Sequence, residues 1–180
     1  MVKRMTRLVS ILLALMLAPL SAWAEAAPAE RNAAGKPYVL NEFDGTILDV
    51  SQYKGKAIWL NFFTGWCSYC MEEMPAIKQS FDAYSPDELA IVLVHVWQGE
   101  NADDSAKVVE RFGLQDMIML EDEDMALSTL VGVAGFPTSI FIDKEGYIYG
   151  GAYALDYDGM AEYLDGMGVA KLVAAATVAP

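Results

Sequence analysis

An apolar run at residues 57–63 is followed, after a three-residue turn, by a pair of cysteines, and this junction restricts the possible folds more than any other feature. The run reads Ala-Ile-Trp-Leu-Asn-Phe-Phe, in which Asn61 is the single polar member. Such a run is typical of a strand that is buried on both faces of a sheet. After the turn at 64–66, apolar residues at helical spacing predict a helix from about Cys67 to Tyr84. A buried strand that passes directly into a helix indicates an α/β fold.

The same kinds of pattern predict alternating strands and helices along the rest of the chain. They place a second buried strand at 89–96, a helix from Asn101 or Asp103 to Phe112 with Gly113 after it, a short strand at 117–120, a short helix at 125–131, two hairpin strands at 139–142 and 147–149, and a final helix at 158–167. Parallel β-α-β units followed by a hairpin and a helix predict a mixed central β-sheet flanked by helices.

Three other polar features have plain structural interpretations. His95 is interpreted as a strand histidine rather than a ligand. Glu100 is interpreted as a surface-loop acid, with a place along a binding groove as the alternative. The acidic cluster at 121–124 is interpreted as a solvated loop whose acids precede a helix start.

The first 24 residues have the pattern of a secretory signal peptide. Three basic residues precede an apolar run at 8–20, and Ala22-Trp23-Ala24 follows it, which predicts cleavage after Ala24. The run is shorter than the roughly 20 residues of a membrane-spanning helix. We therefore expect export across the inner membrane to the periplasm, with an uncleaved N-terminal anchor as the alternative.

The rest of the chain is expected to form a single domain. Residues 25–35 are small and polar and predict a flexible lead-in, residues 36–168 form the domain, and residues 169–180 are an Ala/Val-rich tail. Near the start of the domain, Asp44-Gly45 is a turn signal between short apolar stretches at 38–40 and 46–48. This pattern predicts a small N-terminal β-hairpin.

Net charge and cysteine content narrow the class of protein. The net charge of −13 argues against nucleic acid as a partner. The chain has only two cysteines, Cys67 and Cys70. A disulfide that closes so short a loop stabilises the fold by about 2 kcal/mol through the lower entropy of the unfolded chain, against about 3 kcal/mol for a fifteen-residue loop. The pair is therefore better explained by chemistry than by stabilisation.

The position of the cysteines at a predicted helix start favours thiol chemistry. Unpaired N–H groups and the helix dipole stabilise a thiolate at Cys67, and Cys70 lies one turn further on. We expect Cys67 to be the exposed attacking thiol and Cys70 the more buried resolving thiol. A metal site is disfavoured, because it usually needs four ligands and His95 is the only imidazole. The expected redox group is the Cys67–Cys70 disulfide itself, with no further cofactor.

The segment at 59–75, which contains Trp66-Cys67-Ser68-Tyr69-Cys70, resembles the TlpA/ResA-like (DsbE-type) thioredoxin-family proteins. The stretches at 45–56, 133–138 and 141–146 resemble the same family, so that the resemblance covers about residues 36–167. It implies a thioredoxin-like fold with an added N-terminal β-hairpin, and thiol-disulfide oxidoreductase activity.

The resemblance also implies roles for residues around the cysteines. Pro137 would be a cis-proline against the pair, although most X-Pro bonds are trans, and Phe136 would line the groove where a substrate docks. Trp66 would shape that groove, with core packing as the alternative. Glu73 would move protons to and from the thiols, with a solvated acid as the alternative. Asn61 stands where thioredoxins carry a buried aspartate, so Glu73 would be the nearby acid.

The favoured function is a dithiol reductase for disulfides of exported proteins, with apocytochrome c in cytochrome c biogenesis, or another protein with a CxxC segment, as the candidate substrate. A membrane electron donor of the thiol-disulfide relay type would reduce it, as the family implies. The residues between the cysteines, Ser68 and Tyr69, include no basic group that would favour an oxidant. A dithiol oxidase or isomerase is the nearest alternative, and a non-catalytic binding module or metallochaperone is another. A peroxidase is disfavoured because both cysteines lie in a single CxxC segment.

Overall fold

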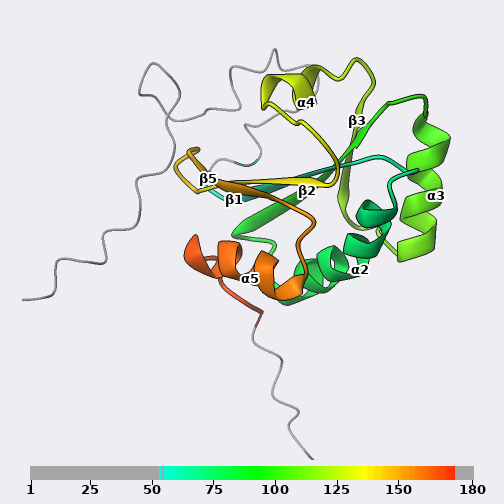
Figure 1. Cartoon of the computed structure of the whole chain (residues 1–180). Coiled ribbons are helices and arrows are strands. Elements are labelled where there is room, and N and C mark those ends of the chain that lie inside the picture. The colour runs from blue at the N-terminus through cyan, green and yellow to red at the C-terminus, as the bar shows by residue number, and fades with distance from the viewer. Residues whose placement is uncertain (1–52, 54, 173–180) are drawn as a thin grey trace, which may run out of the picture.

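The computed structural model describes residue 53 and residues 55–172, which form a five-stranded sheet with helices on both faces (Figure 1). The elements are β1 (Ala57–Phe63), α2 (Ser68–Ala83), β2 (Leu89–Val96), α3 (Ala102–Phe112), β3 (Ile118–Asp122), α4 (Ala126–Leu130), β4 (Thr138–Ile142), β5 (Ile148–Tyr153) and α5 (Tyr157–Gly166). The strands lie in the order β3-β2-β1-β4-β5. The predicted mixed sheet flanked by helices is therefore confirmed.

Strand β1 occupies the centre of the sheet. It pairs in parallel with β2 and antiparallel with β4, so that Trp59 lies opposite Ile91 on one side and Phe141 on the other. All seven residues of β1 and all eight of β2 are buried. Because both faces of the sheet are covered, polar and apolar residues do not alternate along these strands. Both strands have the predicted bounds.

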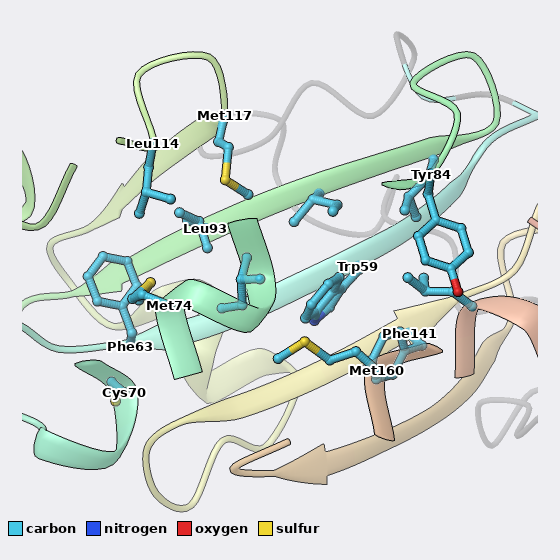
Figure 2. Close-up of a cluster of buried hydrophobic side chains, with 14 of the residues drawn as sticks. Trp59, Phe63, Cys70, Met74, Tyr84, Leu93, Leu114, Met117, Phe141 and Met160 are labelled. Atoms are coloured by element: carbon cyan, nitrogen blue, oxygen red, sulfur yellow. The ribbon is translucent and has the colours of Figure 1, made fainter. Parts of the chain in front are cut away.

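The side chains of β1 alternate between two hydrophobic clusters. Trp59 and Phe63 belong to the cluster that includes buried residues of α2, α3 and α5, part of which is drawn in Figure 2. Leu60 and Phe62 belong to the cluster on the other face, which Leu127 of α4 joins. Burial of each such large side chain contributes roughly 1.5–3 kcal/mol. The two clusters together hold β1, and hence the start of α2, in a fixed position.

The helix ends follow from local capping. Asn101, rather than Asp103, is the N-cap of α3, where its side chain and that of Asp104 form a capping box. Gly113 ends the helix in the left-handed conformation with φ 69°, which a residue without Cβ adopts at little cost. Helix α2 has Cys67 itself as its N-cap residue.

The prediction of a solvated loop at 121–124 holds only for Glu123 and Asp124, which are exposed turn residues before α4. Glu121 and Asp122 are the last two residues of β3. The Asp122 side chain is fully buried and accepts hydrogen bonds from the backbone N–H groups of Leu127 (3.0 Å) and Ser128 (2.9 Å). Asp122 therefore acts at the helix start, as predicted, but as a buried acceptor for unpaired donors of α4 rather than as a solvated acid.

The second hairpin strand is longer than predicted. Strand β5 continues through Gly150 and Gly151, which pair with Phe141 and Ile140 of β4. A Cβ atom at Gly150 would lie 2.7 Å from the ring of Tyr163, so glycine here allows α5 to pack closely on the strand. Glycine usually weakens a strand, which is why the sequence pattern ended too early.

Several predictions concern residues outside the described part of the chain. They are the signal peptide at 1–24, the lead-in at 25–35, the β-hairpin within 38–48 and most of the tail at 169–180. Within residues 53 and 55–172, none of the helices combines the length and apolar character needed to cross a membrane.

Candidate active site

The two cysteines form a disulfide at the junction between β1 and α2. Their Cα atoms are 5.2 Å apart, and the Cys67 sulfur accepts a hydrogen bond from the backbone N–H of Cys70 at 3.1 Å. The first sulfur thus lies where the N-terminal N–H groups of the helix point. Cys67 is 6% exposed and Cys70 is fully buried. Cys67 is therefore the more accessible of the two, although the disulfide is covered more completely than the sequence predicted.

An aromatic pair borders the turn that carries Cys67. Trp66 is 60% exposed, and its ring meets that of Phe136 edge to face with 6.4 Å between centroids. Phe136 belongs to the loop before β4, and the peptide bond between Phe136 and Pro137 is cis. The predicted substrate-binding residues Trp66 and Phe136 thus come together from segments 70 residues apart in sequence. The exposed Trp66 ring is not part of the core, which was the alternative interpretation.

Glu73 lies inside the protein, one helical turn after Cys70. It is 4% exposed, whereas the neighbouring Glu72 is exposed. Its carboxylate accepts hydrogen bonds from the side-chain amide of Asn61 (3.2 Å) and the backbone N–H of Leu155 (3.0 Å). Burial raises the pKa of Glu73, and the hydrogen bonds from Leu155 and Asn61 act in the opposite direction. A buried carboxyl with a raised pKa has the properties of a group that can take up and release a proton in a reaction.

Asn61 connects Glu73 to the sheet. Its amide also lies 3.1 Å from the hydroxyl oxygen of Ser139, which accepts a further hydrogen bond from the Trp59 indole at 2.9 Å. The amide oxygen of Asn61 is buried with no hydrogen-bond partner. Asn61 therefore holds the carboxyl of Glu73 by a neutral donor rather than by a charge.

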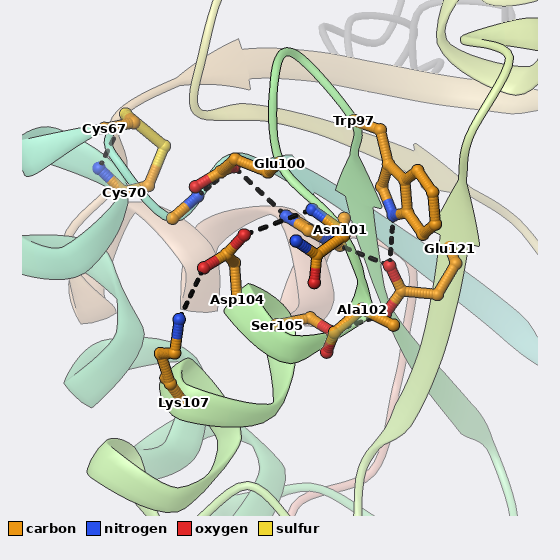
Figure 3. A network of polar contacts seen from close by, with 12 residues as sticks. Cys67, Cys70, Trp97, Glu100, Asn101, Ala102, Asp104, Ser105, Lys107 and Glu121 are labelled. Atoms are coloured by element: carbon orange, nitrogen blue, oxygen red, sulfur yellow. Dashed lines mark hydrogen bonds and ion pairs between the residues drawn. A yellow bond between two sulfur atoms is a disulfide. The ribbon is translucent and has the colours of Figure 1, made fainter.

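Glu100 is part of the site, and the prediction of a surface-loop acid was wrong. Its carboxylate accepts a hydrogen bond from the backbone N–H of Gly65 at 2.8 Å and lies 3.1 Å from Nε2 of His95. The His95 side chain is fully buried, and its Nδ1 lies 2.7 Å from Glu121. Figure 3 shows this polar network beside the Cys67–Cys70 disulfide.

The sequence contained only a partial signal for this network. Glu100 follows the strand that bears His95, but the pairing of His95 with Glu121 depends on the register between β2 and β3. That register is a property of the folded sheet. His95 is a buried strand residue, as predicted. Among the described residues, no three or more His, Cys, Asp or Glu side chains are grouped as metal ligands would be.

A cysteine pair at the start of the helix that follows the central strand of a mixed sheet defines the thioredoxin-like class of proteins. The chain belongs to the AhpC/TSA family, whose model matches residues 32–150.

Curated relatives confirm the resemblance to the TlpA/ResA-like proteins. The chain is 34% identical over 111 residues to the thiol-disulfide oxidoreductase ResA of Geobacillus thermodenitrificans, with 62% of each chain covered. It is 28% identical over 111 residues to ResA of Bacillus subtilis, with 62% of this chain and 60% of the relative covered. The match thus spans somewhat less than two thirds of these relatives.

Solved structures support the fold. The exposed lipoprotein thioredoxin Etrx1 of Streptococcus pneumoniae superposes with a TM-score of 0.58 at 26% identity, covering 65% of this chain and 89% of that one. StoA of Bacillus subtilis superposes with a TM-score of 0.55 at 23% identity, covering 61% of this chain and 83% of that one.

Proposed function

We propose that this chain is an exported thiol-disulfide oxidoreductase that reduces disulfides of extracytoplasmic proteins through Cys67 and Cys70. The observation that carries the proposal is the position of the Cys67 sulfur as the N-cap group of α2, with Cys70 bonded to it from the next turn. A thiolate is stabilised at that position and can be released from the disulfide with little backbone movement. The ResA relatives are thiol-disulfide oxidoreductases, which supports the same chemistry.

The reaction transfers two electrons from the dithiol to the substrate. The Cys67 thiolate attacks one sulfur of a substrate disulfide, so a mixed disulfide forms and the other substrate sulfur leaves as a thiolate. The Cys70 thiolate then attacks the Cys67 sulfur, which closes the Cys67–Cys70 disulfide and releases the second substrate thiolate. Each released thiolate takes up a proton, and the substrate ends as a dithiol.

Glu73 would accept the proton that Cys70 must lose before it attacks. A helix places Glu73 on the same face as Cys70, one turn away. Burial raises the pKa of the Glu73 carboxyl, so that it is a better base than an exposed glutamate. Asn61 has no proton to exchange at neutral pH and serves to orient the carboxyl.

Substrate docking would use the aromatic pair and the loop before β4. Trp66 offers an exposed ring, and Phe136 and Pro137 provide the backbone against which an extended peptide can lie. The substrates would be exported proteins with an accessible disulfide, including CxxC-containing apocytochrome c. The signal-peptide pattern of residues 1–24 supports a periplasmic location. A membrane thiol-disulfide relay protein would return electrons to Cys67 and Cys70.

Capture of mixed disulfides tests this proposal. A Cys70→Ser variant, expressed as the full chain in its export compartment, should accumulate covalent adducts that thiol reductants release. Cys67→Ser is the matched control, because it keeps one cysteine but lacks the attacking sulfur and should capture nothing. Absence of adducts with Cys70→Ser under several growth conditions, or equal capture by both variants, would contradict the proposal.

A further inference from the structure

The turn that carries Cys67 is held from behind by a side chain of a different loop. Gly65, two residues before Cys67, donates its backbone N–H to the carboxylate of Glu100 at 2.8 Å. We propose that Glu100 is a positioning residue for the redox centre, which fixes the turn at 64–66 and thereby the Cys67 sulfur at the start of α2. The proposal rests on the function proposed above and adds a residue to that site.

The contact between Glu100 and Gly65 involves more than one hydrogen bond. A Cβ atom at position 65 would lie 2.6 Å from Oε1 of Glu100, closer than real Cβ contacts allow. The backbone of Gly65 does not have the positive φ that itself favours glycine. A larger residue at position 65 would therefore have to displace the Glu100 carboxylate, and glycine leaves the space that this carboxylate occupies.

Glu100 is itself fixed by a partly buried chain of polar groups. Its carboxylate lies 3.1 Å from Nε2 of His95, and Nδ1 of that imidazole lies 2.7 Å from Glu121. Glu121 accepts further hydrogen bonds from the Trp97 indole (2.6 Å) and the Ser105 hydroxyl (2.5 Å) (Figure 3). The chain joins β2, β3 and α3. The position of the turn is thus fixed by contacts with the sheet and not only by contacts within its own loop.

The placement matters because stabilisation of a thiolate at a helix start depends on short distances. The Cys67 sulfur accepts the Cys70 N–H at 3.1 Å, and the N–H of Cys67 donates to the carbonyl of Thr64 at 3.3 Å. A displacement of about 1 Å in a reacting group lowers the rate by up to about a hundredfold.

The side chain of Glu100 is 11% exposed and borders a hollow that Asp104, Lys107 and Arg111 also line. These charged groups face Glu100 together with His95.

Three substitutions separate positioning from a general loss of folding. Glu100→Ala removes the acceptor for Gly65. Glu100→Gln keeps one side-chain oxygen, which can occupy the position of the Oε2 atom that contacts both Gly65 and His95. Glu110→Gln is the control, because it removes the same charge from an exposed residue of α3. The readouts are the pH profile of Cys67 alkylation in the reduced protein and the rate of insulin disulfide reduction.

We expect Glu100→Ala to displace the alkylation profile and to lower the rate of insulin reduction about tenfold. Glu100→Gln should remain within about threefold of the wild-type rate, because the Gly65 hydrogen bond survives. Coincidence of the Glu100→Ala profile and rate with those of Glu110→Gln would overturn the proposal. If the wild type reduces no disulfide but its alkylation profile still shifts in Glu100→Ala, the proposed function fails while the positioning role stands.

A double-mutant cycle tests the Gly65 contact itself. Gly65→Ala should displace the Glu100 carboxylate and lower the rate about as much as Glu100→Ala does. In the Glu100→Ala background, where the space is free, adding Gly65→Ala should cost less than about threefold further. Equal losses from Gly65→Ala in the two backgrounds would show that the contact does not position the turn and would overturn the proposal.

Discussion

The side-chain amide of Asn61 donates a hydrogen bond to the buried carboxylate of Glu73 across 3.2 Å. This neutral donor and the backbone N–H of Leu155 hold the carboxylate, but burial has the larger effect and raises the pKa of Glu73 above its ordinary value of 4.5. The folded protein therefore binds this proton more tightly than the unfolded chain does. The contribution of Glu73 to the free energy of unfolding consequently falls as pH rises from the ordinary pKa through the raised one.

Glu73→Gln should remove this part of the pH dependence. The glutamine stays neutral, so the variant should gain stability relative to the wild type as pH rises through that window. Urea denaturation of the oxidised protein at a series of pH values measures the effect. Glu72→Gln, on an exposed neighbour, is the control and should follow the wild type. A Glu73→Gln curve parallel to that of the wild type would show that Glu73 has no raised pKa.

Trp66→Ala should weaken the binding of protein substrates without unfolding the enzyme. The ring is 60% exposed, so the free energy of unfolding should change by less than about 0.5 kcal/mol. Loss of an interface tryptophan costs about 1 kcal/mol or more, so KM for a protein disulfide should rise about fivefold or more. Trp66→Phe keeps an aromatic ring opposite Phe136 and should recover most of the affinity. An unchanged KM in Trp66→Ala would show that Trp66 is not part of the docking surface.

Asp122→Ala should destabilise the fold even though this residue lies in a strongly acidic stretch. Two backbone N–H groups at the start of α4 would lose their buried acceptor, which costs about 1–3 kcal/mol. The exposed Asp124→Ala is the matched control and should change stability by less than about 0.5 kcal/mol. Urea denaturation distinguishes the two. Equal effects would mean that Asp122 does not cap the helix.

The sequence was most informative where local patterns determine the structure. The bounds of β1 and β2 follow from continuous apolar runs, because strands buried on both faces need no polar positions. Asn101 and Gly113 mark the ends of α3 because capping depends on the residue itself. The position of the cysteine pair at the start of α2 follows from the apolar residues at helical spacing after the turn at 64–66.

The sequence was least informative where a residue's partner lies on another element. The sequence predicts a solvent-exposed Glu100, because its spacing from Gly65 and His95 along the chain does not reveal that these residues contact it. Asp122 was misjudged because a buried aspartate that accepts two N–H groups has the same local pattern as an exposed one. Such contacts depend on strand register and loop packing, which form only in the folded chain.

The reduction potential of the Cys67–Cys70 disulfide tests the account most directly. Oxidised protein is equilibrated with glutathione or dithiothreitol redox buffers, and the fraction of free thiols is measured by alkylation. A reductant of exported proteins should titrate as a two-electron couple near the thioredoxin value, about −270 mV. A value near that of DsbA, about −120 mV, would contradict a reductase and assign the chain to disulfide formation.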